Sequence, residues 1–249
     1  MKKKTNIEFY KIGLPAENEN SLFIIEYEII LRTVESVNNF NLLYKAGRLG
    51  SKGPSTHEQQ DLYRAMLIFA CAGLDVLLKQ LIKTKISDII SADKKGANEK
   101  FKEYVKSSIN LKDPNKLLNT IALALVDQNP KEILMSEYIK YLTRDSLQAK
   151  EKIITIILAS GFSDKFLSKE RLNSLKDVFE VRNQIIHEMD INILDNLSKN
   201  KGYRKRRQRK AAQIEKYTKI ILDLSVSIFT EYKRKFDEFK IETKKSSVG

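Results

Sequence analysis

The sequence predicts an all-α protein, and three observations carry that prediction. Glycine and proline are scarce, with 9 and 4 copies in 249 residues, which suits long helices better than a fold with many turns. Apolar residues recur at i, i+3 and i+4 spacing through most of the chain, which is the pattern of a helix face. Hydrophobic residues make up 42% of the chain, enough for a substantial core.

The charge balance favours a polyanionic partner. The formal net charge is +13 and the sequence pI is near 9.5, which suits nucleic acid or an anionic membrane surface. A lysine-rich surface without a defined partner is the alternative interpretation. The single cysteine excludes a disulfide framework within one chain. No apolar signal core follows the basic start, and the longest apolar run, residues 65–74, is too short to span a bilayer, so we expect a cytoplasmic protein without a membrane segment.

The first quarter of the chain predicts an arm and one accessory helix, residues 1–54. Residues 1–20 show no periodicity, whereas residues 21–44 carry an apolar stripe that Ser21 can cap. A loop rich in glycine, serine and lysine then ends this region before a second helix, residues 55–91. Ser55 or Thr56 is expected to cap it, with Glu58 as the partner in a capping box.

The remaining chain, residues 55–241, predicts one helical domain followed by a polar tail, residues 242–249. Helices are expected at residues 98–108, 114–126, 130–142 and 153–159, the last of them ended by Gly161. Ser168 caps the next helix, a connection of undetermined structure follows at residues 191–200, and a long helix covers residues 211–241.

The second helix contains one misplaced charge. Its centre, residues 65–78, is apolar almost all the way round, which predicts burial on most sides. Asp75 is the only charge between Arg64 and Lys79, and a carboxylate in such a setting is usually paired or protonated. Cys71 is expected to pack in the core, and His57 to be a surface residue of the first turn.

The segment Val181–Asp190 contains a second misplaced charge. On a helix, Arg182 falls within an apolar stripe, and Asn183 and His187 share one face because they lie four residues apart. Two interpretations stay open: Arg182 pairs with Asp75 while His187 caps the helix end, or Arg182, Asn183 and His187 form a reactive group. The apolar stripe comprises Leu175, Val178, Phe179, Ile185, Ile186 and Met189.

The reactive interpretation favours cleavage of RNA. Histidine moves protons near neutral pH, and arginine binds phosphate and stabilises charge as it builds. The ribose 2′-OH then serves as the nucleophile and leaves a 2′,3′-cyclic phosphate and a 5′-OH. The sequence offers no zinc ligand set, no phosphate loop and no cofactor motif. Arg182 and His187 diverge by about 140° on a straight helix, so a shared site would need two chains about a two-fold axis.

A basic run at residues 199–210 follows this segment. It is expected either to grip the RNA backbone, with Tyr203 stacking on a base, or to form a solvated basic loop. Its candidate RNA-binding residues are Tyr203, Arg204, Lys205, Arg206, Arg207 and Arg209.

The segment Arg182-Asn183-Gln-Ile-Ile-His187 resembles the signature of the HEPN superfamily, near the end of a helix in an all-α bundle. A long apolar helix with one acidic residue, Asp75, and a final long helix resemble the same fold, over residues 55–240. The stretches at residues 141–148 and 187–190 are similar to the RiboL-PSP-HEPN branch. The short motif gains its specificity from this context.

The HEPN resemblance implies a metal-independent, cofactor-free endoribonuclease that acts as a homodimer with a composite site. It implies a toxin or anti-phage defence effector, with an antitoxin or defence-system partner. Arg182, Asn183 and His187 would form the catalytic group, Asn183 in a supporting role, and Asp75 would be a further supporting residue. Because some members have lost activity, a non-catalytic RNA- or protein-binding module is the alternative.

Overall fold

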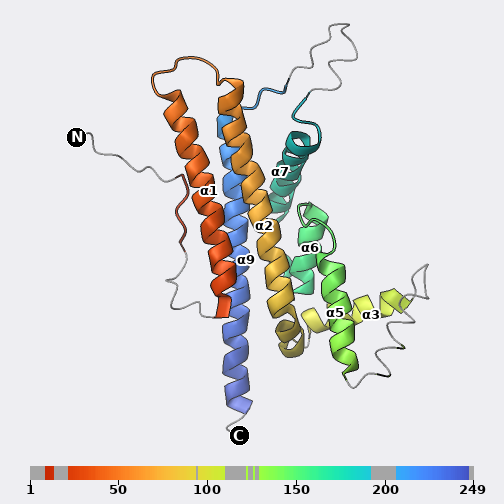
Figure 1. Ribbon diagram of the computed structural model, residues 1–249. Helices are drawn as coiled ribbons and strands as arrows, with labels where there is room; N and C mark the ends of the chain where they lie inside the picture. Colours follow the sequence, from red (N-terminus) through yellow and green to blue (C-terminus); the bar gives the residue numbers. More distant parts are fainter. Residues whose placement is uncertain are drawn as a thin grey trace. The chain divides into compact units, whose positions relative to one another are not determined.

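The computed structural model describes residues 9–13, 22–93, 95–109, 122, 126, 129–191 and 206–246 (Figure 1). Within these residues the protein is all-helical, with seven α-helices, one 3₁₀ helix and no strand, which confirms the predicted fold class. The helices are α1 (Ile24–Arg48), α2 (His57–Ala92), α3 (Ala97–Ile109), α5 (Pro130–Thr143), α6 (Lys150–Ala159), the 3₁₀ helix η2 (Asp164–Phe166), α7 (Lys169–His187) and α9 (Ala211–Ser246).

The chain divides into two compact units, and the division passes through α2 and α9. The first unit comprises residues 1–74 and 169–229, and the second comprises residues 75–168 and 230–249. The expected N-terminal region, residues 1–54, therefore belongs to the same unit as the first half of α2. The predicted helix at residues 114–126 lies almost entirely outside the described residues.

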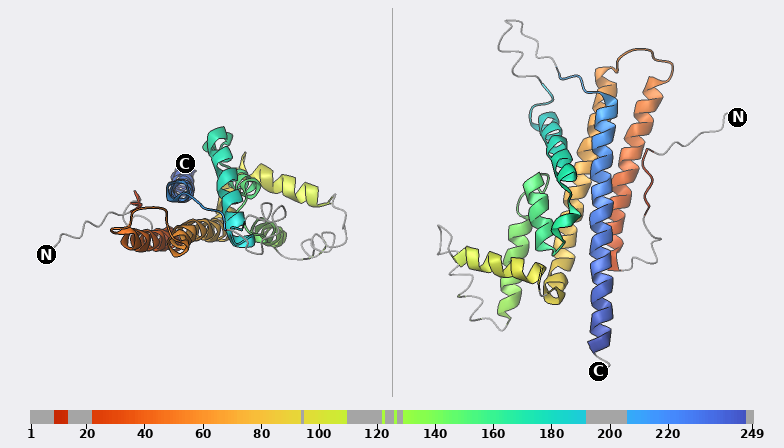
Figure 2. Two further views of the ribbon diagram at one scale, coloured as in Figure 1. Left: turned by 90° about the horizontal axis from the view of Figure 1, so that it is seen from above. Right: turned by 180° about the vertical axis from the view of Figure 1, so that it is seen from behind.

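The first unit packs α1, the start of α2, α7 and the start of α9 side by side (Figures 1 and 2). Aromatic pairs join α1 to its neighbours, with ring centroids 5.1 Å apart for Phe40 and Phe69 and 5.7 Å apart for Phe23 and Phe229. Such pairs add stability beyond the apolar area that they bury. The buried α1 stripe follows helical spacing and comprises Ile30, Val34, Val37 and Asn41.

A capping box starts α2, but its acceptor is one residue later than predicted. The amide of Gln59 donates to Thr56 Oγ1 over 3.3 Å, and the amide of Thr56 donates to Gln59 Oε1 over 3.1 Å. Gln59 therefore takes the place expected for Glu58, because Thr56 rather than Ser55 is the capping residue and its box partner lies three residues on.

The second unit is built from the end of α2, the helices α3, α5 and α6, and the end of α9. In this unit α3 contacts both α5 and α6. Gly161 ends α6 as predicted, with a left-handed φ of 67°, and a Cβ at this position would lie 2.1 Å from Asp93 Oδ2. The same carboxylate accepts from Lys235 Nζ at 3.3 Å, so one partly buried ion pair joins the α2–α3 turn to α9.

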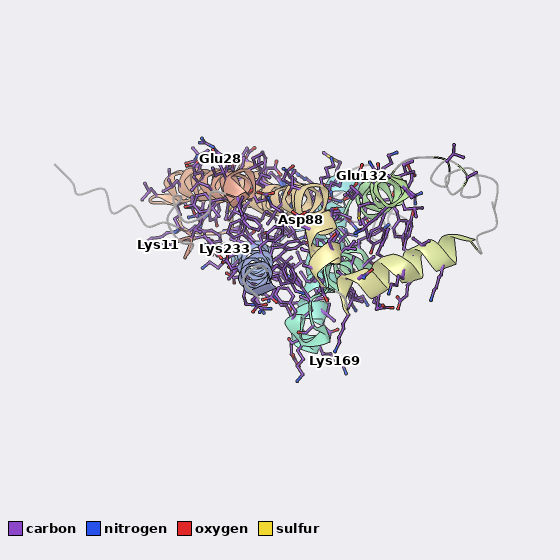
Figure 3. The ribbon with its side chains drawn as sticks, turned by 90° about the horizontal axis from the view of Figure 1, so that it is seen from below. Lys11, Glu28, Asp88, Glu132, Lys169 and Lys233 are labelled. Carbon is purple, nitrogen blue, oxygen red and sulfur yellow. The ribbon has the colours of Figure 1, made fainter. Side chains whose placement is uncertain are left out.

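Many charged side chains are exposed, among them Asp88, Glu132 and Lys169, which are labelled in Figure 3. Among the described helices, α2 alone is long and apolar enough to cross a membrane by length and composition. Half of its most apolar stretch is buried inside the protein, and the core helix of a soluble protein meets the same criterion.

Candidate functional site

The helix α7 carries the Arg182–His187 motif and ends at His187. It packs through an apolar stripe formed by Leu175, Val178, Phe179, Val181 and Ile185. Met189 was expected to continue this stripe, but its side chain is 63% exposed, so that part of the prediction is wrong. The helix has already ended there, and Met189 has a left-handed φ of 51°, so helical spacing no longer sets its direction.

Arg182 is half-buried and bonds to its neighbour on the helix. Its Nη1 donates to Asn183 Oδ1 over 2.9 Å. Its Nε is buried and has no hydrogen-bond acceptor among the described residues. Its charge lies close enough to Cys71 of α2 to act on the thiol. Burial raises the pKa of the Cys71 thiol to about 12, while the positive charge of Arg182 acts in the opposite direction. The thiol is fully buried, which confirms the expected packing role of Cys71.

His187 is the last residue of α7, and its side chain is exposed. Asn183 is exposed too and lies one helical turn earlier, as the spacing predicts. This surface therefore presents the imidazole of His187 and the amide of Asn183 to solvent, one helical turn apart. His57, the other histidine, is an exposed residue at the start of α2, as expected.

Asp75 binds residues other than the predicted ones. Its Oδ2 pairs with Lys79 Nζ at 3.0 Å, and its Oδ1 accepts from the amide of Leu147 over 2.6 Å. Both carboxylate oxygens of Asp75 have partners within its own unit, and Arg182 bonds to Asn183 within the other unit. In this structure Asp75 joins α2 to the segment before α6 through the bond from the amide of Leu147, and its expected supporting role stays a prediction.

The buried acid of this region is Asp190, which follows α7 and is 0% exposed. Arg64 Nε donates to its Oδ2 over 2.8 Å, and Arg209 Nη2 donates to its Oδ1 over 2.7 Å. Asp190 has a left-handed φ of 56°, next to left-handed Met189. For residues other than glycine this conformation costs roughly 1–2 kcal/mol each, so two in succession require support from their surroundings.

The described part of the basic run is bound to acidic residues of the protein itself. Arg206 Nη2 lies 2.7 Å from Asp61 Oδ1, and Arg207 Nη1 lies 2.8 Å from Glu188 Oε2. The hydrogen bond from Arg206 holds the pKa of the Asp61 carboxyl below its ordinary value. Arg209 is only 11% exposed and is committed to Asp190. These three arginines anchor the chain where it enters α9. The expected RNA-binding residues Tyr203, Arg204 and Lys205 lie outside the described residues.

Sequence reasoning missed Arg64 as a functional candidate, although a signal was present. Arg64 continues the alternating i+3, i+4 seam of Leu67, Cys71 and Leu74, so it stands at a core position, as Arg182 does. Its side chain is 3% exposed. An arginine in a buried seam requires an acid, and that acid lies 126 residues away at Asp190.

Within the described residues, no group of three or more His, Cys, Asp or Glu side chains could hold a metal ion. Comparison of the chain with protein-family models, curated proteins and solved structures finds no match.

Proposed function

We propose that the chain is an endoribonuclease of the HEPN type, which cleaves RNA through attack of the ribose 2′-OH without a metal ion. One observation carries the proposal. Arg182 is half-buried, has no carboxylate partner among the described residues, and bonds to Asn183 beside an exposed His187. A structural arginine in such a position requires an acid, and Asp75, the acid expected for it, is bound to Lys79.

Each of the three side chains has its own role in the proposed reaction. His187 takes the proton from the 2′-OH or gives one to the leaving 5′ oxygen, which suits a residue that changes charge near neutral pH. Arg182 binds the phosphate and stabilises the negative charge that builds on it. Asn183 orients the guanidinium through the bond from Nη1 to Oδ1. The expected products are a 2′,3′-cyclic phosphate and a 5′-OH.

The active form in this proposal is a homodimer. Arg182 and His187 lie five residues apart on α7 and diverge by about 140°, so one chain does not direct both to one phosphate. Two copies about a two-fold axis can join the arginine of one chain to the histidine of the other. The resemblance further suggests a cytoplasmic toxin or defence effector restrained by an antitoxin-type partner.

The first test is RNA cleavage in the presence of EDTA. We expect wild-type protein to cleave RNA and leave DNA of the same sequence intact, because DNA lacks the 2′-OH. His187→Ala and Arg182→Ala should each abolish cleavage, while His57→Ala and Lys176→Ala, at exposed positions, should retain it. End-group analysis should find cyclic phosphates. Full activity of His187→Ala would sink the proposal, and salt-sensitive RNA binding without cleavage would favour the non-catalytic module.

The second test addresses the composite site. Mixing inactive Arg182→Ala with inactive His187→Ala, under conditions where subunits exchange, should restore about a quarter of wild-type activity, because half of the dimers are mixed and each has one intact site of two. A mixture of His187→Ala with itself under the same conditions is the control. If the mixed proteins stay inactive after proven exchange, each site belongs to a single chain.

A further inference from the structure

We propose that Asp190 is a positioning residue of the candidate site: clamped by Arg64 and Arg209, it fixes the end of α7 and with it the direction of the His187 imidazole. Its consequence for catalysis rests on the proposed function, whereas the positioning itself does not require RNA cleavage.

The clamp holds both oxygens of the Asp190 carboxylate. Oδ2 accepts from Arg64, whose Nη2 lies 2.7 Å away, and Oδ1 accepts from Nη2 of Arg209 over 2.7 Å. Asp190 is 0% exposed and the Arg64 side chain is 3% exposed, so water does not replace these bonds. Two planar guanidinium groups on one carboxylate leave it a single orientation.

Asp190 also closes the backbone around His187 into a ring. The amide of Asp190 donates to the carbonyl oxygen of Gln184 over 2.9 Å. Arg209 also bonds Gln184, through Nη2 to Oε1 over 2.5 Å. Gln184 lies three residues before His187 and Asp190 three residues after it. His187 therefore stands in the middle of a segment whose two ends are bound to each other.

The left-handed backbone indicates that the turn after His187 needs support from its surroundings. Met189 and Asp190 have φ values of 51° and 56°, and neither is a glycine. Such residues persist where the surrounding structure over-determines them, and the clamp on Asp190 provides that constraint. Without it, the turn after His187 is free to relax, and the last turn of α7 frays as helix ends do.

The clamp also relates His187 to the helix beside Arg182. Arg64 comes from α2, and Cys71 of the same helix lies close enough to Arg182 for the positive charge to act on its thiol. The helix α2 therefore lies near Arg182 and also supplies a residue of the clamp next to His187. A reactive pair must be held within a fraction of an ångström of its working geometry, which a helix provides better than a loop does.

Arg64→Lys tests the proposal, because lysine keeps the charge but not the planar fork. The chain has two histidines, so His57 is an internal reference for side-chain NMR of His187. In samples of wild type and variant that have the same oligomeric state, we expect the His187 ring signals of Arg64→Lys to broaden or split while those of His57 keep their positions. Arg206→Lys, the same change in the partly exposed pair with Asp61, should leave both histidines as in wild type.

A kinetic readout separates positioning from simple support of the fold. For folded Arg64→Lys we expect kcat on RNA to fall by about tenfold or more with KM little changed, since misplacement affects the chemical step. If Arg64→Lys does not fold, Arg209→Lys takes its place in both measurements. Unchanged His187 signals in a folded clamp variant overturn the positioning role. Failure of wild type to cleave RNA overturns the proposed function instead and leaves the NMR result to decide the positioning.

Discussion

Asp75 and Asp190 are both acids beside apolar helices, yet the protein holds them in different ways. Asp75, in the second unit, takes its charged partner Lys79 from one turn along the same helix, and its side chain is 14% exposed. Asp190, in the first unit, is 0% exposed and takes arginines from α2 and from the segment that leads into α9. One pair is local and partly exposed, and the other is buried and joins distant parts of the chain.

This difference decides how much each acid contributes to stability. A pair near the surface is screened by water, and its loss usually costs at most about 1 kcal/mol. Removing one member of a buried pair leaves an uncompensated charge inside the protein, which costs about 3–5 kcal/mol. Asp75, whose partner lies one turn away in the sequence, therefore contributes less to stability than Asp190 does.

The largest expected effect follows from Asp190→Asn. The substitution keeps the size of the side chain but leaves the buried Arg64 with the half-exposed Asp61 as its remaining counter-charge, so we expect the free energy of unfolding to fall by about 3 kcal/mol, the lower end of the range for a broken buried pair. Urea unfolding at pH 7, followed by circular dichroism, measures this value. Glu188→Gln, which removes the half-exposed partner of Arg207, should cost less than about 1 kcal/mol and is the matched control.

Asp75→Asn provides the other half of the comparison. The asparagine oxygen can still accept from the amide of Leu147, so only the pair with Lys79 is lost and about 1 kcal/mol is expected. A loss as large as that of Asp190→Asn would contradict the distinction between the two acids. Lys79→Met should match Asp75→Asn, because it removes the same ion pair.

The fold could be predicted wherever local rules govern it. The start of α2 depends on the capping residue Thr56, although its box partner is Gln59 rather than the predicted Glu58, and the end of α6 depends on Gly161 in a left-handed conformation. The shared face of Asn183 and His187 needs only the helical repeat. Each of these features is set by residues within one or two turns, so a sequence window contains the information.

The partners of the charged residues could not be predicted in the same way. Arg64 and Asp190 are 126 positions apart, and only the packing of α7 against α2 brings them together. Helical spacing alone puts Met189 in the apolar stripe. The chain leaves the helix before Met189, and the turn that it forms there is held by the long-range clamp, which the sequence does not show. The arginines at 206, 207 and 209 suggest nucleic acid in sequence, yet each is bound to an acid whose position only the fold determines.

Asp61 tests whether the arginine network around Asp190 extends to the surface, and its expected effect is the smallest. Its carboxylate binds Arg206 at 2.7 Å and Arg64 at 3.1 Å, and its side chain is 51% exposed. The bond from Arg206 lowers the folded-state pKa of Asp61 below its ordinary value. The stabilising contribution is therefore complete above the unfolded-state pKa, about 3.9, and is lost as the pH falls through the lowered folded-state pKa.

Below about pH 4, the stability of Asp61→Asn should accordingly fall less steeply with falling pH than that of wild type, by a small margin because the group is half-exposed. Arg206→Ala should flatten the same part of the curve, since it removes the bond that lowers the pKa. Urea unfolding across this pH range measures both. If neither variant changes the slope, the network ends at the buried pair, and Asp190 is stabilised by Arg64 and Arg209 alone.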